Sequence, residues 1–177
     1  SWSGTMFEYL MPPLLLRTYP ETLFDQSYAS VIDRQIDFAR KRNIPWGISE
    51  SGFYAFDAAL NYQYRAFGVP GLGLRRGLGE DLVVAPYASM LALPIRPQPV
   101  LRNLQTLEQM EMIGSFGLYE AIDYTPERLT LGREYAIVQS YMAHHQGMIL
   151  LALADALLER RMIEERRRAE RAALSLH

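Results

Sequence analysis

A stretch of 36 residues at positions 44–79 constrains the fold of this chain more than any other feature. It reads IPWGISESGFYAFDAALNYQYRAFGVPGLGLRRGLG, and its glycines and prolines indicate a loop with one short helix or strand near residues 56–68. Connections longer than about 12–15 residues are uncommon in compact domains and are usually functional. We therefore expect part of a functional site to be built on this stretch.

Around this stretch, apolar residues at helical spacing predict a mainly α-helical chain with a single domain over residues 1–177. Pro12 and Pro13 are expected to disturb the first helix. Residues 115–128, SFGLYEAIDYTPER, are expected to form loop or short β-structure. The predicted helices cover residues 6–18, 21–42, 82–93, 97–113, 134–158 and a charged terminal helix at 159–177.

Composition argues against several classes of function. The formal net charge of −2 makes nucleic acid an unexpected partner. The chain has no cysteine, which excludes disulfides and thiolate chemistry, and it has only three histidines and no HEXXH motif. We therefore expect no metal and no cofactor. The apolar stretches YLMPPLLL and MILLALADALL are shorter than the roughly 20 residues that span a bilayer, so no membrane-spanning helix is expected.

Two glutamates, Glu50 in PWGISESG and Glu120 in GLYEAIDYTP, are the strongest candidates for chemistry. Each lies in a glycine-containing loop beside aromatic residues, where partial burial can tune the pKa of a carboxyl group. Cleavage of a glycosidic bond needs such a pair, and aromatic faces stack on sugar rings. Glu8 is a third candidate, with Asp57 and Asp123 as supporting acids. A lone glutamate in such a loop more often serves as a cap or a hydrogen-bond acceptor.

His144 and His145 lie on a predicted helix, where neighbouring side chains point about 100° apart and are poorly placed to grip one metal. Two interpretations stay open for them. Each is a hydrogen-bonded histidine of the core or helix face, or one of them, with Gln146, contacts a sugar hydroxyl or orients a carboxylate.

Six stretches together resemble the glycoamylase-like domain of bacterial cyclic β-1,2-glucan synthases, which is related to β-1,2-glucanases. They run in order along nearly the whole chain. They are SWSGTMFEYLMPPLL, IPWGISES, YQYRAFGVPGLGLRRGL, DLVVAPYASMLAL, GLYEAIDYTPERL and SYMAHHQGMILLAL.

This resemblance implies an all-α fold of the (α/α)6-toroid type. Twelve helices need more than 177 residues, so the expectation is a partial toroid of six to seven helices with long functional loops, the C-terminal portion of such a domain or a truncated form. A partial toroid leaves part of its core exposed, which favours self-association.

The resemblance further implies a glycoside hydrolase or transglycosylase that acts on a β-1,2-glucan chain by a retaining double displacement. By motif, Glu50 is assigned as acid/base and Glu120 as nucleophile. The residues expected to bind the sugar are Glu8, Trp46, Asp57, Tyr64, Arg65, Asp123, Tyr124, His144, His145 and Gln146.

The expected partner is a β-linked glucan, and the expected location is the cytoplasm, at the inner membrane where the chain forms part of a larger membrane-bound protein. Two alternatives remain open at this point. One is a non-catalytic glucan-binding or scaffolding module of a larger synthase. The other is a helical structural protein without a ligand, in which the carboxylates lie far apart and the aromatic residues are buried.

Overall fold

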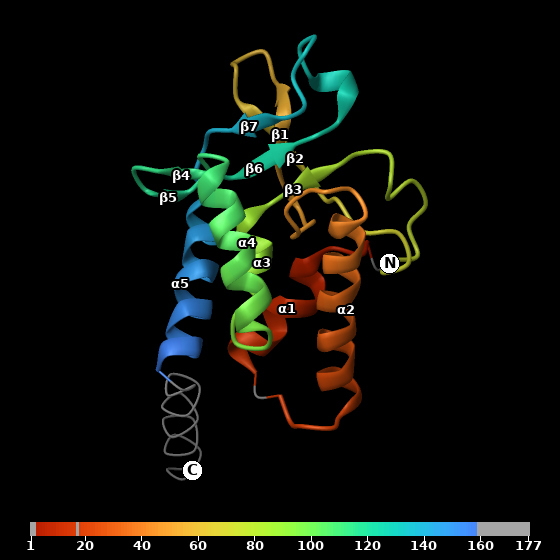
Figure 1. The fold of residues 1–177 in the computed structure, drawn as a ribbon, viewed down its shortest axis with the longest axis vertical. Coiled ribbons are helices and arrows are strands. Elements are labelled where there is room, and N and C mark those ends of the chain that lie inside the picture. Colours follow the sequence, from red (N-terminus) through yellow and green to blue (C-terminus); the bar gives the residue numbers. More distant parts are fainter. Residues whose placement is uncertain (1–2, 17, 159–177) are drawn as a thin grey trace, which may run out of the picture.

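The computed structural model describes residues 3–16 and 18–158 (Figure 1). The helices occupy one end of the molecule in Figure 1 and the strands the other. The helices are α1 (Met6–Leu15), α2 (Leu23–Arg40), α3 (Pro86–Met90), α4 (Pro97–Gln109), α5 (Ala143–Leu157) and the 3-10 helix η1 (Pro126–Arg128). The strands are β1 (Ser51–Phe56), β2 (Tyr62–Arg65), β3 (Val83–Val84), β4 (Ile113–Gly114), β5 (Gly117–Leu118), β6 (Ala121–Asp123) and β7 (Ala136–Val138).

The strands form three small antiparallel sheets. β1 pairs with β2, β4 pairs with β5, and β6 lies between β3 and β7 in a three-stranded sheet. In the first sheet Gly52 is opposite Tyr64, and the register shifts between Phe53 and Phe56, which is opposite Tyr62. This shift is a bulge of the kind that bends a strand locally.

The expectation of an all-α partial toroid with six to seven helices is wrong. The part of the chain that the structure describes has five α-helices and a mixed α/β content. β2 lies in the segment expected to form a short helix or strand, and β5 and β6 lie in the segment expected to form loop or short β-structure. β1, β3, β4 and β7 were not predicted. β1 lies in the stretch whose glycines and prolines indicate a loop, and β3, β4 and β7 have only two or three residues, too few for alternation to show.

Two of the predicted helices are confirmed with shorter bounds, and three need correction. α1 passes through Pro12 and Pro13 and ends at Leu15, and α2 buries the predicted face with Val31 and Ile32. Residues 82–93 contain β3 before the short α3. In residues 97–113 the helix α4 ends at Gln109, and β4 begins at Ile113. Residues 134–158 contain β7, and α5 begins only at Ala143. β3 and β7 pair with β6, and β4 pairs with the adjacent β5, so strand pairing overrides helical propensity in these segments. The predicted terminal helix at 159–177 lies outside the described residues.

The core has two main parts, which meet at the junction of helices and strands. One is formed by apolar side chains of α1, α2, α3 and α5, such as Leu10, Ile32 and Leu91. The other lies beneath the strands and includes Phe53, Phe67 and Val84. The 46–51 loop runs between these parts, because Trp46 belongs to the first and Ile48 to the second.

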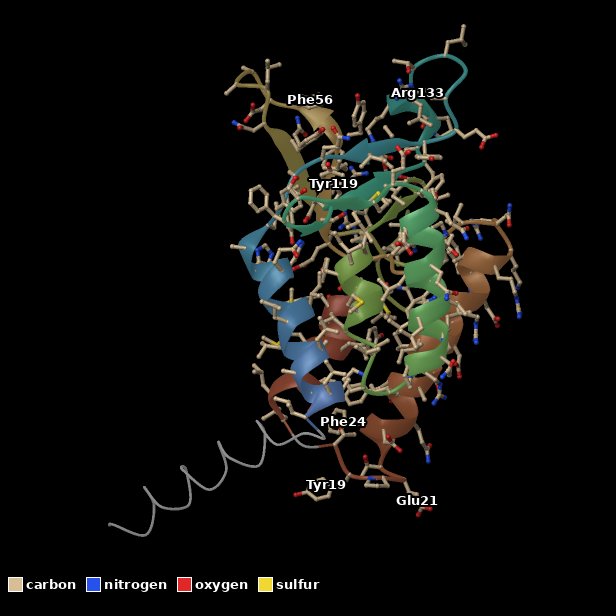
Figure 2. All side chains as sticks on the ribbon, turned by 60° about the vertical axis from the view of Figure 1, so that its left-hand side comes forward. Tyr19, Glu21, Phe24, Phe56, Tyr119 and Arg133 are labelled. Carbon is tan, nitrogen blue, oxygen red and sulfur yellow. The ribbon has the colours of Figure 1, made fainter. Side chains whose placement is uncertain are left out.

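An apolar hollow of about 880 Å³ lies between α1, the N-terminal half of α2 and the loop at residues 71–74. Large apolar side chains at its rim are exposed to solvent, including Leu23, Phe24 and Leu74. Figure 2 shows Phe24 at the end of the molecule opposite the strands. Within residues 3–16 and 18–158, no helix is long and apolar enough to cross a membrane.

Candidate active site

The WGISES loop is held in place by two buried amide side chains, one from each of two helices. Gln35 of α2 accepts from the backbone N–H of Ile48 and donates to its carbonyl oxygen, both at 2.9 Å. Asn103 of α4 accepts from the backbone N–H of Trp46 at 3.0 Å and donates to its carbonyl oxygen at 2.9 Å. These bonds satisfy backbone groups that would otherwise be buried without partners. They fix the loop before it reaches Glu50.

Gly47 allows the loop to pass close to the segment before α3. Its φ of +127° is unfavourable for residues with a side chain. A Cβ atom there would lie 3.0 Å from the carbonyl oxygen of Ala85. The Gly47 carbonyl in turn accepts from the Ala85 backbone N–H at 2.8 Å. The glycine of WGISES is therefore required by packing rather than by chemistry.

Tyr87 of α3 anchors the end of the loop. Its hydroxyl oxygen lies 2.9 Å from Ser49 Oγ and 2.9 Å from the carbonyl oxygen of Glu50. Burial, followed by smaller contributions that include the charges of nearby acids, raises the pKa of Tyr87 well above its usual value. The phenol therefore keeps its proton and remains a hydrogen-bond donor. It holds the backbone of Glu50 while the Glu50 side chain stays partly exposed.

Glu120 is buried, with 3% of its surface exposed, and both of its oxygens have partners. Oε1 accepts from the backbone N–H of Gly52 at 2.9 Å, and Oε2 lies 2.9 Å from Nδ1 of His145. An ionised carboxylate can only accept, so this geometry requires the proton on Nδ1. A Cβ on Gly52 would come within 3.2 Å of Glu120 Cγ, so glycine is what lets the carboxylate approach β1.

His145 connects this carboxylate to Tyr87. The two rings are stacked with centroids 3.7 Å apart and an angle of 12°. His145 is 1% exposed, and its Nε2 atom is buried without a hydrogen-bond partner among the described residues. A buried polar atom without a hydrogen-bond partner is rare, because it lowers the stability of the folded state.

Tyr64 brings Glu50 and Glu120, hereafter the carboxylate pair, into one site. Burial, then the charges of Glu50 and Glu120 and a hydrogen bond with the Glu50 side chain, raise the pKa of Tyr64. Its ring centroid lies 6.1 Å from that of His145 and 6.4 Å from that of His144. Tyr119, the neighbour of Glu120, is at the junction of helices and strands in Figure 2, which locates the site in the molecule.

His144 lies beside the same acids. Burial and the adjacent His145 lower the pKa of His144, and the charges of Glu120 and Glu50 oppose that shift. The structure thus brings together five of the predicted residues, on the WGISES loop, β2, the start of β6 and the first turn of α5. They are Glu50, Tyr64, Glu120, His144 and His145.

Three predicted sugar ligands have structural contacts elsewhere. Glu8, in the first turn of α1, holds the segment before that helix, because its carboxylate accepts from the backbone N–H groups of Ser3 and Gly4. Trp46 is 6% exposed and packs in the helical core. Gln146 donates to the carbonyl oxygen of Leu118 at 2.9 Å and so ties β5 to α5.

Two more predicted residues lie on the β1–β2 hairpin but away from the carboxylate pair. Asp57 accepts from Ala59 and Asn61 in the turn between the strands, and its backbone hydrogen bond with Asn61 is the main cause of its lowered pKa. Arg65 forms an ion pair with Asp81 and lies over the ring of Phe53, on the opposite face of the hairpin from Tyr64.

Asp123 and Tyr124, the last two predicted ligands, also make internal contacts. Asp123 is fully buried and bonds the guanidinium of Arg128, at 2.6 Å from Nε and 3.0 Å from Nη2. It also accepts from the backbone N–H groups of Tyr54 and Thr125. Tyr124 packs against Tyr135, with ring centroids 5.7 Å apart.

No sequence signal marks two residues that build the site, Tyr87 and Gly52. Tyr87 was part of a segment interpreted as an ordinary helix, and its stacking on His145 depends on α3 and α5 lying together in the fold. Gly52 was one of many loop glycines. Within the described part of the chain, no group of three metal-ligating side chains is present.

Comparison with known proteins decides the family. A family profile named Glycoamylase, with the description "Putative glucoamylase", matches residues 1–165. The chain belongs to the glycoamylase family. The resemblance expected from the sequence is confirmed by a relative, the "Cyclic beta-(1,2)-glucan synthase NdvB" of Rhizobium meliloti (strain 1021). It is 45% identical over 164 residues, which are 93% of this glycoamylase chain and 6% of that protein.

Two solved structures share the fold of this glycoamylase chain. One is a "putative glucoamylase" from Bacteroides caccae, with a TM-score of 0.59 and 17% identity. The other is an endo-β-1,2-glucanase from Chitinophaga pinensis in complex with sophorotriose and glucose, with a TM-score of 0.58 and 15% identity. Each match covers 88% of this chain and 36% of the other. The glycoamylase chain therefore spans about a third of these structures and a small fraction of the synthase.

Proposed function

We propose that this chain forms part of a glycoside hydrolase or transglycosylase that acts on β-1,2-glucan through Glu50 and Glu120. One observation carries the proposal: Glu120 is hydrogen-bonded to His145, the His145 ring stacks on Tyr87, and the Tyr87 hydroxyl lies 2.9 Å from the carbonyl oxygen of Glu50. The β-1,2-glucan substrate comes from the names of the synthase and the glucanase to which the chain is similar.

In this proposal Glu50 is the general acid/base, because its side chain is partly exposed and is hydrogen-bonded to Tyr64. It gives a proton to the glycosidic oxygen as the bond to the anomeric carbon breaks. The carboxylate of Glu120, positioned by Gly52 and His145, attacks that carbon and forms a glycosyl ester. Glu50 then takes the proton from the hydroxyl that displaces the ester, either water for hydrolysis or a sugar hydroxyl for transglycosylation.

A second function, a non-catalytic glucan-binding module, is favoured by the burial of Glu120. A carboxylate that is 3% exposed, with a partner on each oxygen, also fits a purely structural role. In that case Glu50 and Tyr64 bind sugar and no bond is cleaved.

The experiment that separates the two is incubation of the whole protein with linear β-1,2-glucan, followed by mass analysis for shortened or ring products. Catalysis predicts products with the native chain and loss of products in Glu120→Gln with glucan binding retained. The binding module predicts unchanged glucan in both cases. Equal turnover in the native protein and Glu120→Gln rules out Glu120 as the nucleophile.

We expect His145 to be a positioning residue for Glu120. His145→Leu removes the donor to Oε2 and leaves a buried carboxylate with one partner, so kcat should fall about 10²-fold with little change in KM. His145→Asn places an amide N–H near the position of Nδ1 and should recover most of kcat. The measurement is steady-state kinetics on β-1,2-glucan. Equal losses in both variants would show that the hydrogen bond to Glu120 is not what matters.

Self-association of the 177-residue chain is a further proposal, because the apolar hollow leaves Leu23 and Phe24 78% and 68% exposed. Phe24→Asp should shift the chain toward monomer in sedimentation velocity, since a charge in an apolar contact is costly to bury. Asp33→Asn, which changes an exposed acid of α2, serves as control. A native chain that is monomeric at all concentrations contradicts this proposal. A cytoplasmic location at the inner membrane, within a larger protein, stays a prediction.

A further inference from the structure

A second hollow, of about 640 Å³, opens between the β1–β2 hairpin, the end of α4 and the segment that leads through β7. We call it the aromatic hollow. Figure 2 shows Phe56 and Arg133, which mark the hairpin and that segment, together at the strand end of the molecule. The lining includes three tyrosines and two glutamines, which are Tyr54, Tyr62, Tyr135, Gln109 and Gln139.

The register of the hairpin places its aromatic side chains on the face that carries Tyr64. Side chains alternate along a strand, so Tyr62 and Tyr64 share one face. Phe56, opposite Tyr62, packs on it with ring centroids 4.7 Å apart, and Tyr54 lies 5.4 Å from Phe56 and 6.2 Å from Tyr62. Phe53 and Arg65 occupy the other face, where they contact each other.

This aromatic face connects the aromatic hollow to the carboxylate pair. Tyr64 interacts with both Glu50 and Glu120, and Tyr62 lies two residues before it on β2, a step of about 6.6 Å. Gly52, opposite Tyr64, donates to Glu120, and Tyr54 lies two residues after Gly52 on β1. One face of the hairpin therefore carries Tyr64 beside the carboxylate pair and, two residues away on each strand, the rings that line the aromatic hollow.

The chemistry of the aromatic hollow suits a neutral, hydroxylated ligand. Tyrosine rings offer faces for the C–H groups of sugar rings, and the exposed amides of Gln109 and Gln139 offer both donors and acceptors for hydroxyls. The charged side chains of the lining are one arginine, Arg133, and two glutamates, Glu111 and Glu134, so an anionic ligand is disfavoured. Aromatic rings beside groups that donate and accept hydrogen bonds are a usual feature of ligand sites.

We infer that the aromatic hollow binds a stretch of the glucan chain beyond the sugar units held at the carboxylate pair. The identity of the ligand as β-1,2-glucan rests on the proposed function. A long chain then contacts both regions at once, whereas a short oligosaccharide at the carboxylate pair does not reach the aromatic hollow. The aromatic hollow therefore increases the affinity for long glucans relative to short oligosaccharides.

The test compares binding of long linear β-1,2-glucan and of its trisaccharide to the whole protein, by isothermal titration calorimetry with Glu50→Gln as the background. Tyr135→Ala should weaken binding of the long glucan about tenfold, the loss of one stacking contact, and leave trisaccharide binding unchanged. Phe24→Ala, which removes an exposed aromatic side chain at the opposite end of the molecule, is the control and should change neither.

Because Tyr135 also packs on Tyr124, a second variant tests the inference without removing a ring. The double variant Gln109→Ala/Gln139→Ala changes two exposed side chains. It should weaken binding of the long glucan and leave trisaccharide binding unchanged. Unchanged affinity for the long glucan in both variants overturns the inference, and the proposed function stands if the native protein still turns over glucan. If the variants bind the long glucan more weakly and the native protein forms no product, the result supports glucan binding in the aromatic hollow and contradicts catalysis. Absence of any glucan binding contradicts both.

Discussion

Glu50→Gln is expected to lower the rate of β-1,2-glucan turnover by about 10²–10⁴-fold while glucan binding is retained. The amide keeps the size of the side chain and can still hydrogen-bond Tyr64, but it cannot exchange a proton with the glycosidic oxygen. The backbone anchor that Tyr87 gives to Glu50 is unaffected, so the loop keeps its position. Steady-state kinetics and calorimetry on the same preparation measure the two quantities.

Glu108→Gln is the matched control for this change, since Glu108 is an exposed glutamate of α4. It should leave both turnover and binding as they are. If Glu50→Gln and Glu108→Gln have the same turnover, Glu50 is not the acid/base. If Glu50→Gln loses binding together with turnover, its role is to hold the sugar.

Asp123→Ala should cost about 3–5 kcal/mol of folding free energy, the largest stability effect we expect for a single change in this chain. Asp123 is fully buried, and it bonds Arg128 through two nitrogens as well as two backbone N–H groups. Its loss leaves those donors without their acceptor, although Arg128 keeps an ion pair with Asp81. Urea denaturation with the native chain as reference measures the change.

Asp37→Ala provides the comparison, because Asp37 is half exposed on α2 and pairs only with the exposed Arg40 within one turn. Such pairs contribute about 0.2–1 kcal/mol or nothing measurable. Comparable losses in the two variants would contradict a special role for the buried acid. A normal free energy of unfolding for Asp123→Ala, with weakened glucan binding, would restore its earlier assignment as a sugar ligand.

The parts of the fold that could be predicted are those set by local sequence. The apolar spacing along α2 predicted its buried face, and Thr22 and the basic end of the helix delimit it. The three-stranded sheet could not be predicted, since Val84, Ile122 and Ile137 come together only through pairing of strands that are separated in the sequence. Their environment, not their local pattern, makes them strands.

The candidate site shows the same division. Glu50 and Glu120 were predicted from their glycine-containing and aromatic surroundings, and the structure places both around Tyr64. Glu8 has similar neighbours in the sequence, but its carboxylate accepts hydrogen bonds from the backbone of Ser3 and Gly4. Residue type alone does not separate an acid that accepts from backbone N–H groups from one that faces a substrate. Only the fold shows that His145 connects Glu120 to Tyr87.

The most direct test is a crystal structure of the whole protein carrying Glu50→Gln, grown with a linear β-1,2-glucan oligosaccharide. Our account predicts a glycosidic oxygen within hydrogen-bonding distance of the residue 50 amide, and the adjoining anomeric carbon facing Glu120. An oligosaccharide bound away from these two residues, with Glu120 still enclosed by Gly52 and His145, would contradict it.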